Sequence, residues 1–311
     1  MKKELTVLAV VVFFSLLTYW LVEPFAHGQM HKHVESEHFA YADLPALTKT
    51  GDAAKGAETF MAGGCIGCHS VKALGMETGM DPVSAAASFG VNPPDLSMAG
   101  ALYDEKFLAA LIKNPAHALM VEHKFDPANG KMHPMTQFYG AGGDIDQEVA
   151  DIVAYLKSIA TEEVTPKAAF ENACGRCHAM RYAKWTQIGE RPKFKYKKDE
   201  LRFDATVLDY QDYLTKYMGK LPPDLSMYIR SRSFHFLETF IENPQSHLAG
   251  TAMPRTGVSA ESAEKVLEYL DHVGDPSRAE RTSVGIKVMI YLLIFAVFAY
   301  LWKKQVWKEL H

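Results

Sequence analysis

The length and charge of this 311-residue chain exclude some classes of protein. Its 33 lysines and arginines against 37 aspartates and glutamates give a formal net charge of -4, which argues against nucleic acid as a partner. Roughly 260 residues lie between two apolar end segments, which is too many for one minimal domain and suits two small ones.

The chain opens with an apolar segment. Leu5 to Val22 form an uninterrupted stretch without a charge, preceded by Lys2 and Lys3. A helix of that length crosses a bilayer, so we predict an N-terminal membrane anchor over residues 1–23. The alternative is a cleavable signal peptide, but no small residues of a cleavage site follow. Next come four histidines whose spacing matches no helical metal-ligand pair, and we predict a solvated loop there: His27, His31, His33 and His38.

All four cysteines lie in two Cys-x-x-Cys-His runs, at residues 65–69 and 174–178. Two thiols at this spacing add to the vinyl groups of a porphyrin, and the adjacent histidine then lies under the iron. A redox dithiol or half of a zinc site is the alternative, but no further cysteine exists to complete a zinc site. We therefore predict two covalently bound haem c groups, with thioether bonds to Cys65, Cys68, Cys174 and Cys177 and proximal ligands His69 and His178.

A repeat divides the chain between the anchors into two halves. Pro-Pro-Asp-Leu-Ser-Met occurs at 93–98 and again at 222–227, and an Asn-Pro pair follows each copy at the same distance, at 114–115 and 243–244. Six identical residues with an equal offset indicate an internal duplication.

The periodicity within each half predicts helices, and no strand pattern of comparable strength occurs. We predict a mainly α protein with two tandem haem lobes like class I cytochromes c, at residues 24–160 and 161–276. The linker at 160–165 is short, so the two lobes are expected to lie close together. The predicted helix N-caps are Asp144, Thr165 and Ser259.

A sixth ligand for each iron is predicted in the loop before the last helix of each half. In the second half Met253 is the candidate. In the first half Met135 is preferred, because Met-x-x-Phe resembles the ligand loop of small c-type cytochromes, while Met132 and His133 remain alternatives. A histidine–methionine pair fills the coordination sphere and raises the potential of the iron, which favours electron transfer over catalysis.

A second apolar segment lies near the C-terminus. Residues 283–302 are long enough to cross a bilayer, so we predict a transmembrane helix there and a cytoplasmic tail at 303–311. Because bacterial haem c attachment takes place outside the cytoplasmic membrane, the lobes are predicted on the periplasmic side of the inner membrane. The basic stretch at 191–198 is interpreted as a surface for an acidic partner or lipid headgroups, or as an ordinary solvated face.

The segment 221–232, Leu-Pro-Pro-Asp-Leu-Ser-Met-Tyr-Ile-Arg-Ser-Arg, resembles cytochrome c1, the haem subunit of the quinol:cytochrome c oxidoreductase or cytochrome bc1 complex. The resemblance is best over residues 165–311, where it implies the same attachment cysteines, His178 and Met253. The additional N-terminal lobe and anchor make the chain similar to the dihaem cytochrome c1-like subunits of certain bacterial bc complexes.

That resemblance implies an electron-transfer subunit without a catalytic site of its own. Single electrons would pass from quinol at cytochrome b through the Rieske iron-sulfur protein to the two haems, and then to a periplasmic cytochrome c or a terminal oxidase. It also implies a dimeric complex in the lipid bilayer. The alternatives are the dihaem subunit of a cbb3-type cytochrome c oxidase and a dihaem peroxidase, which needs an open or displaceable position on one iron.

Overall fold

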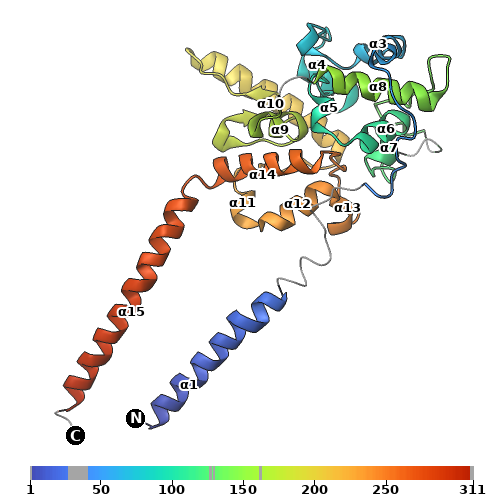
Figure 1. The fold of residues 1–311 in the computed structure, drawn as a ribbon. Helices are drawn as coiled ribbons and strands as arrows, with labels where there is room; N and C mark the ends of the chain where they lie inside the picture. The colour runs from blue at the N-terminus through green and yellow to red at the C-terminus, as the bar shows by residue number, and fades with distance from the viewer. Residues whose placement is uncertain (1, 27–40, 126–127, 129, 161–162, 309–311) are drawn as a thin grey trace.

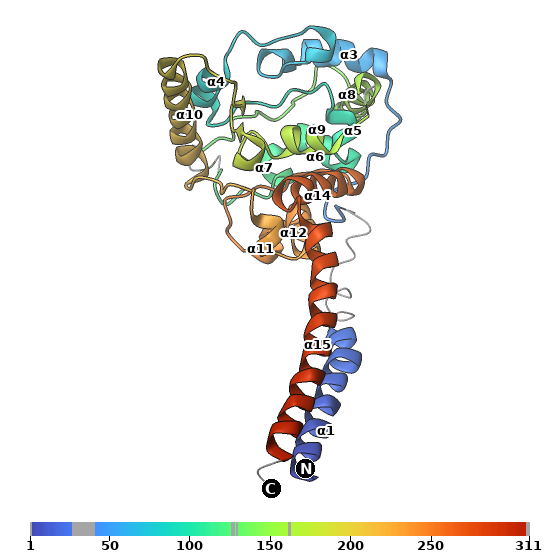
Figure 2. The same cartoon turned by 90° about the vertical axis from the view of Figure 1, so that its left-hand side faces the viewer.

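The chain folds into a helical head carried on two long helices (Figures 1 and 2). The computed structural model describes residues 2–26, 41–125, 128, 130–160 and 163–308. The four histidines of the predicted loop after the first anchor, and residues 161–162 of the linker between the halves, lie outside these ranges.

The two long helices coincide with the predicted membrane anchors. α1 (Lys2–Leu17) continues through a π-helical turn, η1 (Thr18–Val22), and α15 spans Arg278–Lys308. Both are long and apolar enough to cross a membrane. None of the residues in the apolar stretch of either helix is buried against the rest of the protein. The N- and C-termini lie at the same end of the molecule (Figure 2). There Nζ of Lys303 is 3.7 Å from Oε1 of Glu4. The arrangement is compatible with anchoring at both ends.

The two halves of the head contain a similar succession of helices. The first half comprises α3 (Ala53–Ala62), η2 (Cys65–Gly67), η3 (Lys72–Leu74), α4 (Pro82–Phe89), α5 (Ala99–Leu102), α6 (Glu105–Lys113), α7 (Pro115–Ala118) and α8 (Ile145–Ile159). The second half comprises α9 (Pro166–Ala173), η5 (Arg181–Ala183), β1 (Trp185–Thr186), β2 (Gly189–Glu190), α10 (Lys197–Met218), α11 (Tyr228–Ser231), α12 (Phe234–Glu242), α13 (Pro244–His247) and α14 (Ala260–Gly274).

The duplication extends to helix lengths and caps. Three short helices of the first half, α5, α6 and α7, have the same lengths as α11, α12 and α13 of the second half. The first residues of each pair are separated by the same number of positions as the two copies of the repeat. α8 and α14 are also equal in length. The predicted caps are confirmed: the side chains of Asp144, Thr165 and Ser259 accept hydrogen bonds from backbone N–H groups in the first turns of α8, α9 and α14.

The first and last helices of each half pack against each other through an aromatic pair. The rings of Phe60 and Tyr155 are 5.4 Å apart between α3 and α8, and those of Phe170 and Tyr269 are 5.1 Å apart between α9 and α14. In the first half the helices approach so closely that a Cβ atom on Gly56 would lie 1.9 Å from the carbonyl oxygen of Asp151. Glycine at this position therefore permits the crossing.

Replacing Gly56 by alanine should destabilise the head. The added methyl group forces α3 away from α8, and overpacking of this kind costs about 2–3 kcal/mol. Chemical unfolding followed by circular dichroism measures the loss. Gly79→Ala is the matched control, because a Cβ atom there meets nothing within 4 Å. Equal stability of the two variants would contradict the close crossing.

The largest hydrophobic cluster of the head is shared by the two halves. It joins Leu102, Phe107 and Ala110 of the first half to residues of α9, α12 and α14. The segment after Met253 crosses to the first half, where the N–H of Ser259 donates to the carbonyl of Leu102 (3.0 Å). Gly257 (φ +75°) lies so close that a Cβ atom would be 2.0 Å from the ring of Phe107. The halves are therefore packed as one body.

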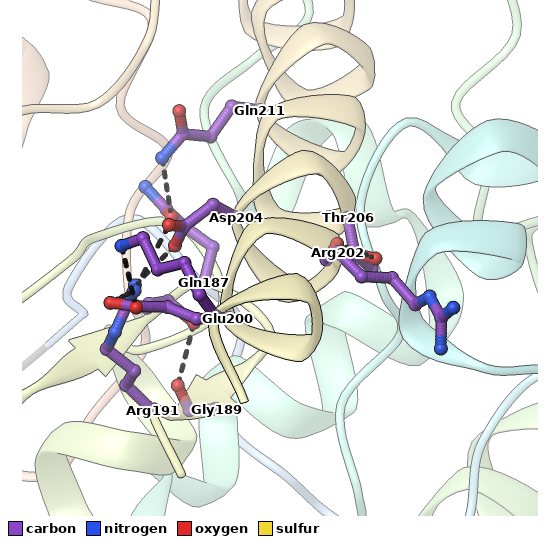
Figure 3. A network of polar contacts seen from close by, with 10 residues as sticks. Gln187, Gly189, Arg191, Glu200, Arg202, Asp204, Thr206 and Gln211 are labelled. Carbon is purple, nitrogen blue, oxygen red and sulfur yellow. Dashed lines mark hydrogen bonds and ion pairs between the residues drawn. The ribbon is translucent and has the colours of Figure 1, made fainter. Parts of the chain in front are cut away.

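A second contact between the halves is made by α10, which packs on α4. Tyr210 and Leu214 are fully buried there, together with Ala86 of the first half. The β1–β2 hairpin is fastened to α10 by polar contacts, shown in Figure 3: Arg191 bonds Glu200 (3.0 Å) and Asp204. The arginine of the basic stretch 191–198 thus has a structural role.

The chain leading into the head is fixed to the second half by an ion pair. Arg255 is buried, and its guanidinium donates to both carboxylate oxygens of Asp43, at 3.0 and 2.6 Å. The hydroxyl of Tyr41 donates to the carbonyl of Val258 (2.7 Å). Burial opposes ionisation of Asp43, but its hydrogen bonds with Arg255 and the charge of Arg255 outweigh burial and hold the pKa of Asp43 below its usual value.

This ion pair should make stability depend on pH. Because the pKa of Asp43 is lower in the folded chain, its stabilisation is present above the unfolded pKa of about 4 and is lost as pH falls through the folded pKa. We expect Asp43→Asn to cost about 1 kcal/mol or less at pH 7, because the side chain of Asp43 is 54% exposed and solvent screens its pairing with Arg255. The difference from wild type should shrink below pH 4 in chemical unfolding; a constant difference would contradict the pairing.

Candidate haem sites

Each Cys-x-x-Cys-His run follows the first helix of its half in a single turn. Gly64 adopts φ +70° after α3 and directs the chain into η2. The N–H of His69 then donates to the carbonyl of Cys65 (3.0 Å), and the N–H of His178 donates to that of Cys174 (2.9 Å). One helical turn therefore joins the first cysteine to the histidine in both motifs.

None of the cysteines of the two motifs is in a disulfide, so all four are free. Within the described part of the chain, no group of three or more His, Cys, Asp or Glu residues could hold a metal ion.

Both motif histidines are held by a proline carbonyl from the repeated Pro-Pro-Asp-Leu-Ser-Met segment. Nδ1 of His69 lies 2.9 Å from the carbonyl oxygen of Pro94, and Nδ1 of His178 lies 2.8 Å from that of Pro223. A carbonyl only accepts, so Nδ1 carries the proton and Nε2 keeps its lone pair for a metal. Burial lowers the pKa of both histidines, which favours the neutral ligand form. This donor set fits a haem iron.

The aspartate and serine of the repeat fasten the segment that follows each histidine. The carboxylate of Asp95 accepts from the hydroxyl of Ser70 (2.9 Å) and from the N–H of Lys72 (3.2 Å). In the second half, Asp224 accepts from the N–H of Arg181 (2.9 Å), the residue in the position of Lys72. Ser226 accepts in turn from the N–H of Tyr182 (3.1 Å). The repeat thus holds each histidine loop in place, a role that its sequence did not reveal.

The loops with the predicted methionine ligands are anchored at equivalent points. The N–H of Phe138, three residues after Met135, donates to the carbonyl of Ile112 (3.0 Å). The hydroxyl of Thr256, three residues after Met253, donates to the carbonyl of Ile241 (3.0 Å). Ile112 and Ile241 are themselves related by the offset between the two copies of the repeat. The loops that contain Met135 and Met253 are therefore both tied to the end of the corresponding helix, α6 or α12, three residues after the methionine.

The surroundings of these loops favour Met135 over its two alternatives. Phe138 packs in the same cluster as Cys65, just as Ala252 packs with Cys177. Met132 is 60% exposed. Nδ1 of His133 lies 3.1 Å from the backbone nitrogen and 3.2 Å from the carbonyl oxygen of Met135, and its Nε2 lies 3.4 Å from the hydroxyl oxygen of Tyr217. His133 is thus engaged in shaping the loop.

Two residues between the sites were not singled out from the sequence. Arg176 lies inside the second motif and donates from Nη1 to the carbonyl of Asn92 in the first half (3.0 Å). Tyr103 lies next to it: burial raises the pKa of Tyr103, while the charge of Arg176 and a hydrogen bond with it oppose that rise. Such a contact between halves has no local signal in the sequence.

The paired cysteines, the histidine with a free Nε2 and the helical surroundings define a c-type cytochrome, with covalently bound haem c. A family model described as cytochrome c matches residues 53–160, and a model of the cytochrome C1 family matches residues 253–310. The chain is a cytochrome c1-like electron-transfer protein.

A curated relative agrees with that class. The chain is 21% identical to cytochrome c1 of Allochromatium vinosum over an alignment of 199 positions, which covers 46% of this chain and 82% of the relative. No solved structure matches the chain.

Proposed function

We propose that the chain is the dihaem cytochrome c subunit of a bc1-type quinol:cytochrome c oxidoreductase. The observation that carries the proposal is the duplication of the histidine support: in both halves a Cys-x-x-Cys-His turn meets a proline carbonyl, at 2.9 Å in the first and 2.8 Å in the second. The second support is the match of the C-terminal part, including α15, to the cytochrome C1 family.

Each half would hold one haem c with the same types of residue. Cys65 and Cys68 would bind the first haem covalently, with His69 and Met135 as axial ligands. Cys174, Cys177, His178 and Met253 would serve the second. When bound, a histidine–methionine haem supplies one-electron transfer at a raised potential. The chain's residues hold the ligands in fixed positions and exclude water, which reduces the reorganisation that accompanies each electron.

The partners follow from membership in such a complex. Electrons would come from quinol at cytochrome b through the Rieske iron-sulfur protein, and would leave to a periplasmic cytochrome c or a terminal oxidase. The two terminal helices would anchor the subunit in the bacterial inner membrane with its head on the periplasmic side. The shared core supports a relay between the haems, because it fixes their separation. The complex is expected to be dimeric.

The test is purification of the full-length chain in mild detergent through an affinity tag, with identification of bound proteins and a quinol-driven reduction assay. We expect cytochrome b and a Rieske protein to co-purify, and c-type haem reduction to stop when the Rieske protein is removed. A copper-haem oxidase core in their place would instead identify the dihaem subunit of a cbb3-type oxidase.

A further inference from the structure

The side chain of Arg176 crosses from the second haem motif into the first half. Its Nη1 donates to the carbonyl of Asn92 (3.0 Å), two residues before the proline that supports His69. Tyr210 closes the arrangement, since its hydroxyl donates to the carbonyl of Arg176 (2.9 Å) and accepts from the N–H of Asn92 (3.2 Å). Two of these hydrogen bonds involve Arg176 and the third joins Tyr210 to Asn92, so the three together hold the arginine at the boundary between the halves.

This guanidinium has no acidic counterpart among the described residues. Its Nε is buried and has no hydrogen-bond partner, and no described carboxylate forms an ion pair with it. The groups that raise the pKa of Arg176 against its burial are Tyr103, Cys177 and Tyr210, all of them neutral at pH 7 in these surroundings. Burying a cation without an anion beside it costs free energy, so we expect an anionic group to lie next to this guanidinium.

The guanidinium of Arg176 lies against the segment that supports the first haem motif. Its Nη1 donates to the carbonyl of Asn92, and this segment continues to Pro94, whose carbonyl oxygen is 2.9 Å from Nδ1 of His69. The side chain therefore reaches from the second motif toward the first site.

We infer that Arg176 binds a propionate of the first haem from across the boundary between the halves. A propionate is a carboxylate, the partner for which a guanidinium is best shaped, and each haem carries two. A fixed cation beside the first haem favours its reduced form, which has one positive charge less. Arg176 therefore raises the potential of the first haem. This inference rests on the proposed function, in which both halves hold haem.

The test is a redox titration of the full-length chain in detergent, with resonance Raman spectra of the propionate-bending modes. Arg176→Gln should lower the potential of the first haem by at least about 59 mV, a tenfold change in its reduction equilibrium, and should shift a propionate band. Arg176→Lys keeps the charge, so we expect a smaller fall in the potential of the first haem, together with a shifted propionate band. This variant also tests the inference if Arg176→Gln does not accumulate.

Two further variants make the result interpretable. Arg202→Gln removes an arginine of α10 whose side chain is 79% exposed, and it should change the reduction equilibrium of either haem by less than about threefold. Met135→His assigns the first haem, because loss of the methionine lowers only that potential. Haem content of the wild type is measured first: a single haem would contradict the proposed function. If the wild type holds two haems but Arg176→Gln changes neither the potential of the first haem nor the propionate band, this inference alone is overturned. A shift of potential confined to the second haem would overturn it as well.

Discussion

A chain in which Cys65 and Cys68 are both replaced by alanine should carry one covalent haem, whereas the wild type should carry two. Thioether bonds form only at cysteine, and the second motif stands on its own turn with its own proline carbonyl. The mass of the denatured chain, compared with its haem absorbance, gives the number of covalent haems directly.

The matched variant replaces Cys174 and Cys177 by alanine and should also retain one haem. Comparison of the two variants separates the spectra of the two sites. A wild-type chain with a single haem, lost completely in one of these variants and unaffected in the other, would show that only one half binds haem and would contradict the proposed relay.

Replacement of Met253 by histidine should lower the potential of the second haem strongly. Methionine stabilises the reduced iron relative to histidine, and axial ligands span about 0.8 V among haem proteins, so we expect a fall on the order of 0.2 V. The sulfur-to-iron charge-transfer band of that haem should disappear. Potentiometric titration with visible spectra measures both effects.

The control for this variant is Met227→His, in the repeated segment that supports His178. Met227 is 45% exposed and should be no ligand, so its replacement should leave both potentials in place. In the first half, Met135→His and Met132→His form the same kind of pair. A normal charge-transfer band after replacement of Met135, with loss of the band after replacement of Met132, would reassign the first ligand.

Local patterns predicted much of this fold. The caps at Asp144, Thr165 and Ser259 were identified from residues adjacent to apolar stripes, and each accepts the expected bonds. α10 was missed, although Val207, Tyr210, Leu214 and Met218 form a buried stripe at helical spacing, because the many charged and polar residues along the helix obscure that stripe. There the stripe is narrow and the helix is mostly solvated.

What the sequence could not show depends on contacts between distant residues. The role of the repeated Pro-Pro-Asp-Leu-Ser-Met lies in bonds that its prolines make to His69 and His178, far from them in the chain. The backbones of Tyr103 and Val258 form an isolated β-bridge, and the guanidinium of Arg176 donates to the carbonyl of Asn92. Each contact joins one half to the other. The sequence therefore predicted two lobes joined by a linker but not their common core.

The common core also bears on how the protein is made. Cys174 belongs to it and is only 8% exposed, and burial raises the pKa of its thiol to about 12. Once the halves have packed, this thiol is out of reach and unreactive. Under the proposed function, haem would have to be joined to the second motif before the two halves pack, so that haem attachment and folding would compete for the same short interval.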